Sequence, residues 1–420
     1  MKLEIIGEYS VHHLKKDVLS GIVVGIIAIP LGLGFSIASG INPVTGLYTT
    51  IVAGLLISIF GGSRFQIGGP TGAFVPVLLG IMLQFGYENL LIAGFMSGIL
   101  LIIFAICKVG SLIKFFPQST IIGFQSGIAV IIFTGQIPNF LGLHNIDKSK
   151  YFYLNMKEIF ENLTKVNIYS VITAAICLLI ILVVLHFSPK SIGISYLLGI
   201  LFSSLISSML FSSQIETISS IYGKIPNQLP IPHFPQVTID KMITLLPSSF
   251  VIAVLVGLQS LLTARVADEM TQSKHCSKRE LIGQGIVNMV TPLFHGIPAA
   301  GEIARTVTNI KNGASSPIAG ITHALFVLFV LLLLAPYASY VSLASLAPVL
   351  MLVAWNISKR EQFSTILKDK STHSLILTTT FLLTVFTNLT VGIGAGLCLS
   401  LLFFLKRRMK NNHNELKETK

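Results

Sequence analysis

Charged residues are scarce in this chain of 420 residues. Asp, Glu, Lys and Arg make up 11% of it, whereas hydrophobic residues make up 52%. A soluble domain has roughly a quarter of its residues charged, so the low value excludes an ordinary soluble protein. Apolar segments of about 20 residues, the length needed to cross a membrane, recur from Asp17 almost to Lys406. We therefore expect an all-α, polytopic membrane protein without a separate soluble domain between its spans.

Cysteine is rare as well, and the motifs of metal sites and of intramembrane enzymes are missing. The cysteines are scattered without a C-x-x-C pair or metal-ligand spacing, at Cys107, Cys177, Cys276 and Cys398. We expect no disulfide, no metal site and no cofactor. Because neither H-E-x-x-H, G-x-S-x-G nor a pair of catalytic carboxylates stands in a span, the sequence does not predict an enzyme.

The formal net charge of +12 comes from Lys and Arg in short loops between the apolar segments. A nucleic-acid-binding protein would gather such residues on one face or arm, so we expect no nucleic-acid partner. In membrane proteins these residues are enriched in cytoplasmic loops. Most of them lie inside if the N-terminus is cytoplasmic. The sequence therefore predicts a multi-pass protein of the inner (plasma) membrane, in contact with the lipid bilayer, with both termini in the cytoplasm.

Apolar runs between charged or Pro/Gly breaks predict about fourteen helices. The expected spans are 17–39, 43–61, 70–85, 89–107, 118–142, 167–187, 192–212, 246–268, 277–296, 301–311, 315–335, 339–356, 371–388 and 390–405. The longest break, 213–245, separates a first repeat (1–212) from a second (246–405), and a short tail (406–420) follows. With about seven helices in each repeat, an odd number, the second repeat must run inverted. Inverted-repeat transporters bind their substrate near the membrane midplane between broken helices.

The third helix of each repeat is interrupted by Gly and Pro. The first follows Gly68-Gly69-Pro70-Thr71-Gly72-Ala73, and the second follows Gly296-Ile297-Pro298-Ala299-Ala300-Gly301. A helix that begins inside the membrane exposes unpaired N–H groups and the positive end of its dipole. Two such ends together form an anion site. Gly72 and Gly301 would let the anion approach the backbone closely, because they have no side chain. Glycine also serves close helix packing in membranes, which is the simpler explanation for either glycine alone.

Two ionisable residues follow the second interruption, Glu302 and Arg305. Arg305 is predicted to be a fixed positive charge beside the anion; the alternative is an arginine that snorkels to the cytoplasm, because Lys311 follows soon after. Glu302 is a candidate for binding a coupling cation, with a helix cap or an ion-pair partner of Arg305 as the alternatives. His295 and His323 are expected to be packing residues rather than proton relays.

Several segments resemble signature blocks of the sulfate permease (SulP) family. They are Asp17–Pro30 with Ala38–Tyr48, Gly68–Ala73, Gln259–Ala264, Glu280–Asn288 and Ala304–Asn309. The resemblance implies a core-and-gate fold of seven plus seven inverted helices, often a homodimer, that works by an elevator-like movement. It also implies an anion site between the third and tenth helices, lined by the first and eighth. The matching positions are Phe35, Thr71, Gly72, Ala73, Gly301, Glu302 and Arg305.

The chain departs from the family pattern at three places. Members commonly carry a cytoplasmic STAS domain after the last helix, and we expect none here. Many have an acidic residue in the eighth helix and a small one in the tenth, where this chain has Gln259 and Glu302. We therefore expect Glu302, with Gln259 and Thr263, to take the coupling ion. Leu31 follows Pro30 in a pattern closer to the bicarbonate-transporting members, so both sulfate and bicarbonate stay open as substrates.

The membrane potential makes coupling necessary for net uptake. A divalent anion entering against about 100 mV, inside negative, loses about 4.6 kcal/mol, and bicarbonate loses about half of that. We therefore expect a secondary active transporter of a small inorganic oxyanion, by symport with H⁺ or Na⁺. The alternatives are an anion exchanger, an anion channel, or a symporter of protons with a nucleobase or organic anion on the same fold.

Overall fold

A computed structural model describes residues 10–108, 117–149, 151–189, 192–211, 213–369 and 371–387, together with 391–392, 394–396, 398–400 and 402–403. Its helices are α1 (Val11–Ala38), α2 (Val44–Phe60), α3 (Val75–Phe85), α4 (Tyr87–Ile106), α5 (Gln118–Gly135), α6 (Ile137–Leu141), α7 (Phe152–Glu161), α8 (Ile168–Phe187), α9 (Ile192–Leu210), α10 (Ile218–Tyr222), α11 (Ile239–Thr271), α12 (Ser277–Val290), α13 (Ile303–Lys311), α14 (Ile318–Ala338), α15 (Leu343–Ile357), α16 (Arg360–Lys368) and α17 (Thr372–Phe386). Short 3-10 turns, η2 (Gly72–Phe74), η4 (Leu163–Lys165) and η5 (Thr291–Phe294), and two strands, β1 (Gly68–Gly69) and β2 (Ala300–Gly301), complete the described elements.

The all-α prediction is confirmed, and most helices coincide with the predicted spans. In the described part of the chain, seven helical segments are long and apolar enough to cross a membrane: α1, α4, α5 with α6, α8, α9, α11 and α14. Helices α2, α3 and α17 are apolar but shorter. Within the helix predicted at 390–405, the described residues 391–392, 394–396, 398–400 and 402–403 are helical, and the others lie outside the described part of the chain. The total of about fourteen helices stays a prediction.

The predicted inter-repeat loop, 213–245, is partly helical. It contains α10, and α11 begins at Ile239 rather than at 246. The side chain of Thr238 caps α11 by accepting a hydrogen bond from the N–H of Lys241, and Asp240 lies in the first turn. Both features favour a helix start in a polar sequence, which a count of apolar residues does not detect.

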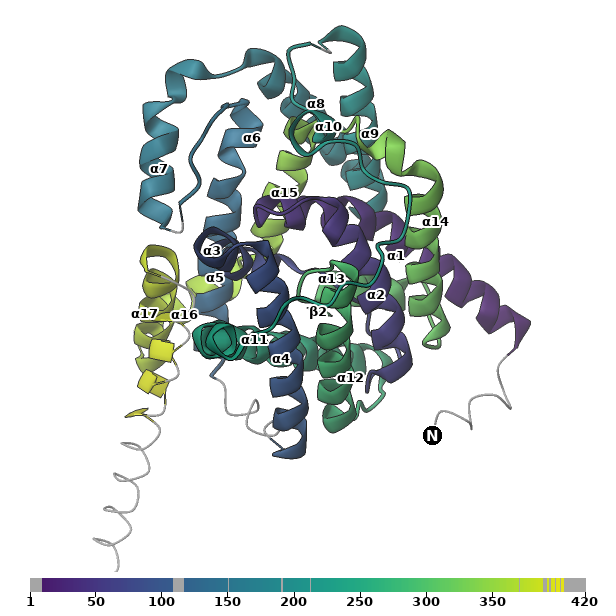
Figure 1. Ribbon diagram of the computed structural model, residues 1–420, viewed down its shortest axis with the longest axis vertical. Coiled ribbons are helices and arrows are strands. Elements are labelled where there is room, and N and C mark those ends of the chain that lie inside the picture. Colours follow the sequence, from purple (N-terminus) through teal and green to yellow (C-terminus); the bar gives the residue numbers. More distant parts are fainter. Residues whose placement is uncertain are drawn as a thin grey trace, which may run out of the picture.

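The helices pack into two groups. The first, the core group, comprises α1–α4 and α11–α14: α4 packs on α11 and α12, and α14 packs on α1 and α2. The second, the gate group, comprises α5–α10 and α15–α17: α5 packs on α17 and α15, and α8 packs on α9 and α15. In Figure 1, α5, α6, α7, α16 and α17 lie along the left side, and α1, α2, α4, α12 and α14 lie at the centre and right. Each group takes helices from both halves of the chain, as the predicted core-and-gate arrangement requires.

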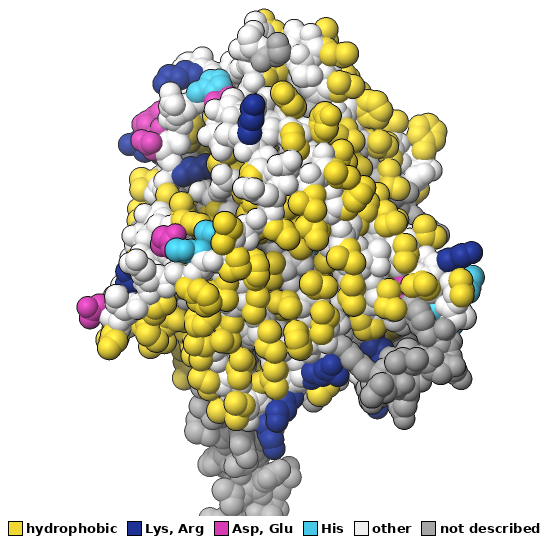
Figure 2. Space-filling view, turned by 45° about the vertical axis from the view of Figure 1, so that its right-hand side comes forward, with side chains coloured by type: hydrophobic (Ala, Val, Ile, Leu, Met, Phe, Trp, Pro, Cys, Tyr) yellow, Lys and Arg dark blue, Asp and Glu magenta, His cyan; other side chains and the backbone are white. Residues whose placement is uncertain are grey.

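Apolar side chains cover much of the outer surface. Figure 2 shows hydrophobic side chains across the middle of one face, with Lys and Arg mainly at the upper left and along the lower edge. Only 28% of the most apolar stretch of helix α8 is buried inside the protein, and its side chains Leu179, Leu182 and Val183 are exposed. Such a large exposed apolar area is stable in contact with lipid rather than water.

Candidate functional site

The two broken helices meet where the short strands that precede them pair. Strands β1 and β2 are antiparallel, with Gly68 opposite Gly301. The N–H of Glu302 donates to the carbonyl of Ile67 (3.0 Å), and the N–H of Ile67 donates to the hydroxyl of Thr306 (3.1 Å). Because the strands are antiparallel, the following helices leave the pair in opposite directions with both N-termini toward it. Each N-terminus contributes unpaired N–H groups and a partial positive charge.

Side chains hold strand β2 in place through its backbone. The amide of Asn288 donates to the carbonyl of Ala299 (2.8 Å) and accepts from its N–H (2.9 Å). The hydroxyl of Ser260 accepts from the N–H of Gly301 (3.0 Å), and the amide of Gln66 donates to the carbonyl of Ser260 (3.2 Å). A side chain at position 301 would overlap the Gln66 amide and displace it from its hydrogen bond with Ser260. These contacts satisfy buried backbone groups that would otherwise cost about 1–3 kcal/mol each.

The first broken helix begins at a turn that Thr71 caps. Its hydroxyl accepts a hydrogen bond from the N–H of Ala73 (3.4 Å). A Cβ atom added to Gly72 would lie 3.1 Å from both the Phe35 ring and the Ile357 side chain. Four of the predicted site residues, Phe35, Thr71, Gly72 and Ala73, therefore lie together, with the Phe35 ring against the start of the helix.

Arg305 is buried inside the core group. Its side chain is 0% exposed, and its Nη2 donates to the carbonyl of Pro70 at 3.3 Å. A side chain at Gly69 would overlap the guanidinium. The structure thus places the charge of Arg305 on the second broken helix at the start of the first. The alternative of an arginine that snorkels toward the Lys311 end is wrong.

Glu302 caps the helix that carries Arg305. Its carboxylate accepts a hydrogen bond from the N–H of Arg305 (2.7 Å) and lies 4.0 Å from Nε of the same residue. Both structural alternatives considered for Glu302, a helix cap and an ion-pair partner of Arg305, therefore apply. The Glu302 side chain is still 15% exposed, and neighbouring Ala304 is exposed, so the start of α13 is open on one side. Cation binding by Glu302 stays a prediction.

The other two coupling candidates, Gln259 and Thr263, lie one turn apart on α11. The Thr263 hydroxyl is within hydrogen-bond distance of the carbonyls of Gln259 (2.8 Å) and Gly301 (3.1 Å). Gln259 also lines a small cavity of about 30 Å³, together with Ala73 and Phe74 from η2 and with residues of α5. The structure thus brings the coupling candidates to the two helix starts.

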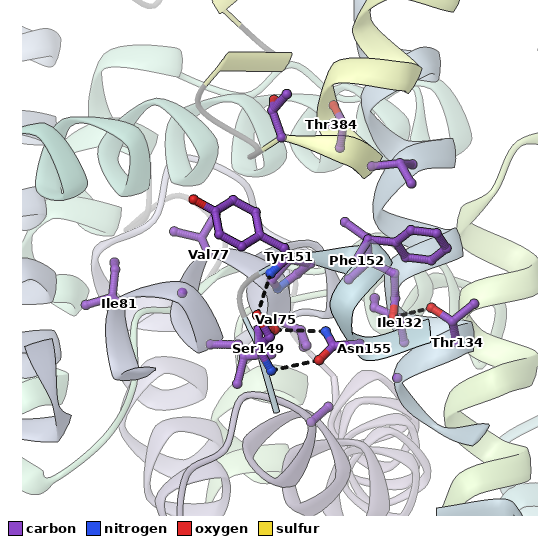
Figure 3. A pocket seen from close by; sticks show the side chains of 18 of the residues that line it. Val75, Val77, Ile81, Ile132, Thr134, Ser149, Tyr151, Phe152, Asn155 and Thr384 are labelled. Atoms are coloured by element: carbon purple, nitrogen blue, oxygen red, sulfur yellow. Dashed lines mark hydrogen bonds between the residues drawn. The ribbon is translucent and has the colours of Figure 1, made fainter. Parts of the chain in front are cut away.

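A larger cavity, which we call the vestibule, lies further along the same boundary between the groups. It has a volume of about 250 Å³ and is lined by α3 and α11 on one side and by α5, α7 and α17 on the other. Figure 3 shows Val75, Val77 and Ile81 of α3 near Tyr151 and Phe152, with Asn155 hydrogen-bonded to Ser149. Ser149, Tyr151, Phe152 and Asn155 line part of the vestibule, so an anion entering on this side would pass them.

Several site residues were not identified from the sequence. Asn288 and Ser260 belong to quoted signature blocks, but no role was assigned to them there. Their side chains bind the backbone of Ala299 and Gly301, on another element, and a sequence motif does not show that contact. Gln66 stands just before the Gly/Pro interruption at 68–72, and nothing in the sequence except this position indicated a role for it. Ser149 and Asn155 lie in a polar connection, where apolar periodicity gives no information.

Comparison with known proteins agrees with this geometry. A sequence model described as "Sulfate permease family" matches residues 14–380. The chain is 52% identical over 411 residues to a protein of Bacillus subtilis named provisionally as sulfate transporter YvdB, covering 98% of this chain and 77% of that one. It is 28% identical over 438 residues to bicarbonate transporter BicA of Picosynechococcus sp., covering 99% and 74%.

Solved structures share the fold. The transmembrane domain of a cyanobacterial bicarbonate transporter BicA superposes with a TM-score of 0.81 at 26% identity, covering 93% of this chain and 98% of that one. SLC26A9 superposes with a TM-score of 0.86 at 19% identity, covering 96% and 67%, which shows likeness of fold alone. From the match over residues 14–380 and the close relative in Bacillus, the chain belongs to the sulfate permease family of membrane anion transporters.

Proposed function

We propose that this protein is a secondary active transporter of a small inorganic oxyanion, which binds between the starts of η2 and α13. One observation carries the proposal: the antiparallel pairing of β1 with β2 directs two helix N-termini at one place, beside the buried charge of Arg305. Helix N-termini bind sulfate and similar anions through backbone N–H groups. Phe35, Thr71, Gly72, Ala73 and Gly301 would surround the anion with small or apolar groups that leave these N–H groups accessible.

Sulfate and bicarbonate are the two candidate substrates, and we favour sulfate. Two relatives from Bacillus subtilis, 52% and 30% identical to this chain, are named provisionally as sulfate transporters. Bicarbonate is supported by the relation to BicA and by the Pro30-Leu31 sequence in α1. Both anions are planar or tetrahedral oxyanions that backbone N–H groups and a guanidinium can bind.

Net uptake requires a coupled cation, which we assign to Glu302, Gln259 and Thr263. The Glu302 carboxylate would supply the negative charge, and the Gln259 amide and the carbonyl of the adjacent residue Gly301 would supply neutral oxygens. Such oxygen atoms suit Na⁺, and the carboxylate alone suits H⁺. Because one cation offsets about 2.3 kcal/mol of the cost of moving an anion against 100 mV, it makes bicarbonate uptake electroneutral and halves the cost for sulfate.

Movement of the core group against the gate group would expose the site to each side in turn. Support comes from the position of both cavities at the boundary of the two groups: α3, α5 and α11 line the larger one, and η2, α5 and α11 line the smaller one. The site itself is built from core-group elements and would move as a unit with them. We place the protein in the plasma membrane with both termini in the cytoplasm, as a homodimer.

The experiment is uptake of radiolabelled sulfate, and separately of bicarbonate, into proteoliposomes with an inward H⁺ gradient, an inward Na⁺ gradient, or neither. The proposal predicts accumulation that one gradient drives. Uptake that depends only on voltage would indicate a channel, and uptake that requires an anion inside would indicate an exchanger. If neither anion enters, nucleobases and organic anions become the substrates to test.

Glu302→Gln tests the assignment of the cation. This variant should retain exchange of labelled for unlabelled anion but lose the acceleration by the cation gradient, because the amide cannot carry the negative charge. Glu269→Gln, at the end of α11, is the matched control and should behave like the wild type. Unchanged cation-driven uptake by the Glu302 variant would contradict the assignment.

A further inference from the structure

A second buried basic side chain, His323 of α14, lies behind the candidate site. It is 0% exposed, and neither ring nitrogen has a hydrogen-bond partner among the described residues. The ring packs against α2 at a glycine: a Cβ atom added to Gly54 would lie 2.9 Å from Nδ1. A buried polar ring without a partner is unfavourable, so a packing role does not explain a histidine at this position. An apolar residue would pack better.

His323 and Arg305 approach the same face of α2. The position of a Cβ on Gly69 is bordered by the Arg305 guanidinium and by Thr50 of α2, and Gly54, which contacts His323, is one helical turn beyond Thr50. One turn is about 5–6 Å along the axis. The two basic groups therefore border neighbouring turns on one face of α2, and they share no hydrogen-bond acceptor among the described residues.

Few other charged groups surround His323. Helix α2 contains no acidic or basic residue, and α14 contains none besides His323. The charges of α1 are confined to its first turns, where the Asp17 carboxylate accepts hydrogen bonds from Ser315 and Ser316 ahead of α14. On α13, the Glu302 carboxylate accepts a hydrogen bond from the N–H of Arg305 as its helix cap. The charge of Arg305 is thus the main one facing the ring.

We propose that His323 binds a proton together with the transported anion. With the site empty, the positive charge of Arg305 opposes a second positive charge on the ring. An anion bound at the two helix starts offsets the charge of Arg305, so the ring accepts a proton. By thermodynamic linkage the proton in turn strengthens anion binding by the same factor.

The site suits a proton rather than a larger ion. Gly54 and Gly69 leave the ring and the guanidinium only the room that they occupy, and a proton needs none. This inference rests on the proposed function, and it adds a proton site distinct from the Glu302 cluster. It would supply a second positive charge, which electroneutral uptake of a divalent anion needs in addition to one cation at Glu302.

The test uses the purified full-length protein in detergent and sulfate as the probe. Sulfate is added in weak buffer containing a pH indicator, and its apparent Kd is measured between pH 5.5 and 8. The wild type should take up protons on sulfate addition, and its Kd should fall with decreasing pH, by at most about tenfold per unit for one linked proton. His323→Leu should take up one proton fewer per sulfate bound than the wild type, and its Kd should depend correspondingly less on pH.

Two variants complete the design. His295→Gln changes a histidine outside the core of the site and should behave like the wild type. His323→Gln replaces His323→Leu if the latter does not fold, although removal of an unpaired buried polar group favours folding. Proton uptake by the His323 variant equal to that of the wild type, or pH-independent binding by the wild type, overturns the inference and leaves anion transport intact. Failure of the wild type to bind sulfate overturns the proposed sulfate site as well.

Discussion

Replacing Arg305 with methionine separates its role in anion binding from any role in stability. The side chain is fully buried, yet among the described residues Nε and Nη1 have no hydrogen-bond partner, and the one bond of Nη2 is long at 3.3 Å. Removing one partner of an ion pair is destabilising when it leaves the other charge buried, but Glu302 is 15% exposed and keeps its helix-cap hydrogen bond, which comes from a backbone N–H. We therefore expect Arg305→Met to fold and to unfold at the same temperature as the wild type or higher.

Anion binding should respond in the opposite direction. The contact with Pro70 places the guanidinium about 4–8 Å from an anion at the following helix start, where a pair of unit charges gains about 2–4 kcal/mol at an effective dielectric constant of 20. Loss of this charge should weaken binding of a monovalent anion about 30- to 1,000-fold, and of a divalent anion more. Arg305→Lys, which keeps the charge but not the planar donor group, should lose less.

The assay is isothermal titration calorimetry in detergent with sulfate and with bicarbonate, beside thermal unfolding of the same samples. Weak binding together with a wild-type or higher unfolding temperature would support the assignment. Wild-type affinity in Arg305→Met would refute the claim that this charge holds the anion. If both the unfolding temperature and the affinity fall, Arg305 is a structural residue, and its contacts with Glu302 and Pro70 are stronger than their distances of 4.0 and 3.3 Å indicate.

Two further substitutions test the packing of the site. Gly72→Ala places a methyl group 3.1 Å from Phe35, where it would block the approach of the anion to the backbone. We therefore expect at least tenfold slower uptake in the proteoliposome assay with little change in unfolding temperature. Gly80→Ala, where a Cβ meets nothing within 4 Å, is the control and should transport normally. Asn288→Leu leaves both backbone groups of Ala299 unpaired, which should cost about 2–6 kcal/mol of stability. An Asn288→Leu protein with wild-type thermal unfolding would contradict the role assigned to that side chain.

The sequence predicted those features that arise from local physical chemistry. Lengths of apolar runs predicted most helices, because a span must bury its backbone in lipid over a fixed thickness. The Gly and Pro interruptions at 68–72 and 296–301 predicted the two helix starts, since only such residues allow a helix to begin there with its backbone exposed. Arg305 was identified because a charge inside a span is costly and therefore seldom incidental.

Features that depend on contacts distant in sequence were not predictable in the same way. The amide of Asn288 serves Ala299 across a turn, and that of Gln66 contacts Gly301 from the other half of the chain. For His323, periodicity locates the residue on a helix but not the arginine on another helix from which its proposed proton role is argued. Helix α7 was missed because it is short and contains polar and charged residues, although Asn155 within it lines the vestibule.

The location of the anion is the central claim, and anomalous scattering from selenate tests it most directly. Selenate has the shape and charge of sulfate, and its selenium atom is located in a crystal without reference to the protein. The account predicts one anomalous peak between the start of η2 and the start of α13, close to Arg305, in crystals of a protein shown to transport sulfate. A peak elsewhere along the boundary of the two helix groups, with none at the helix starts, would contradict it.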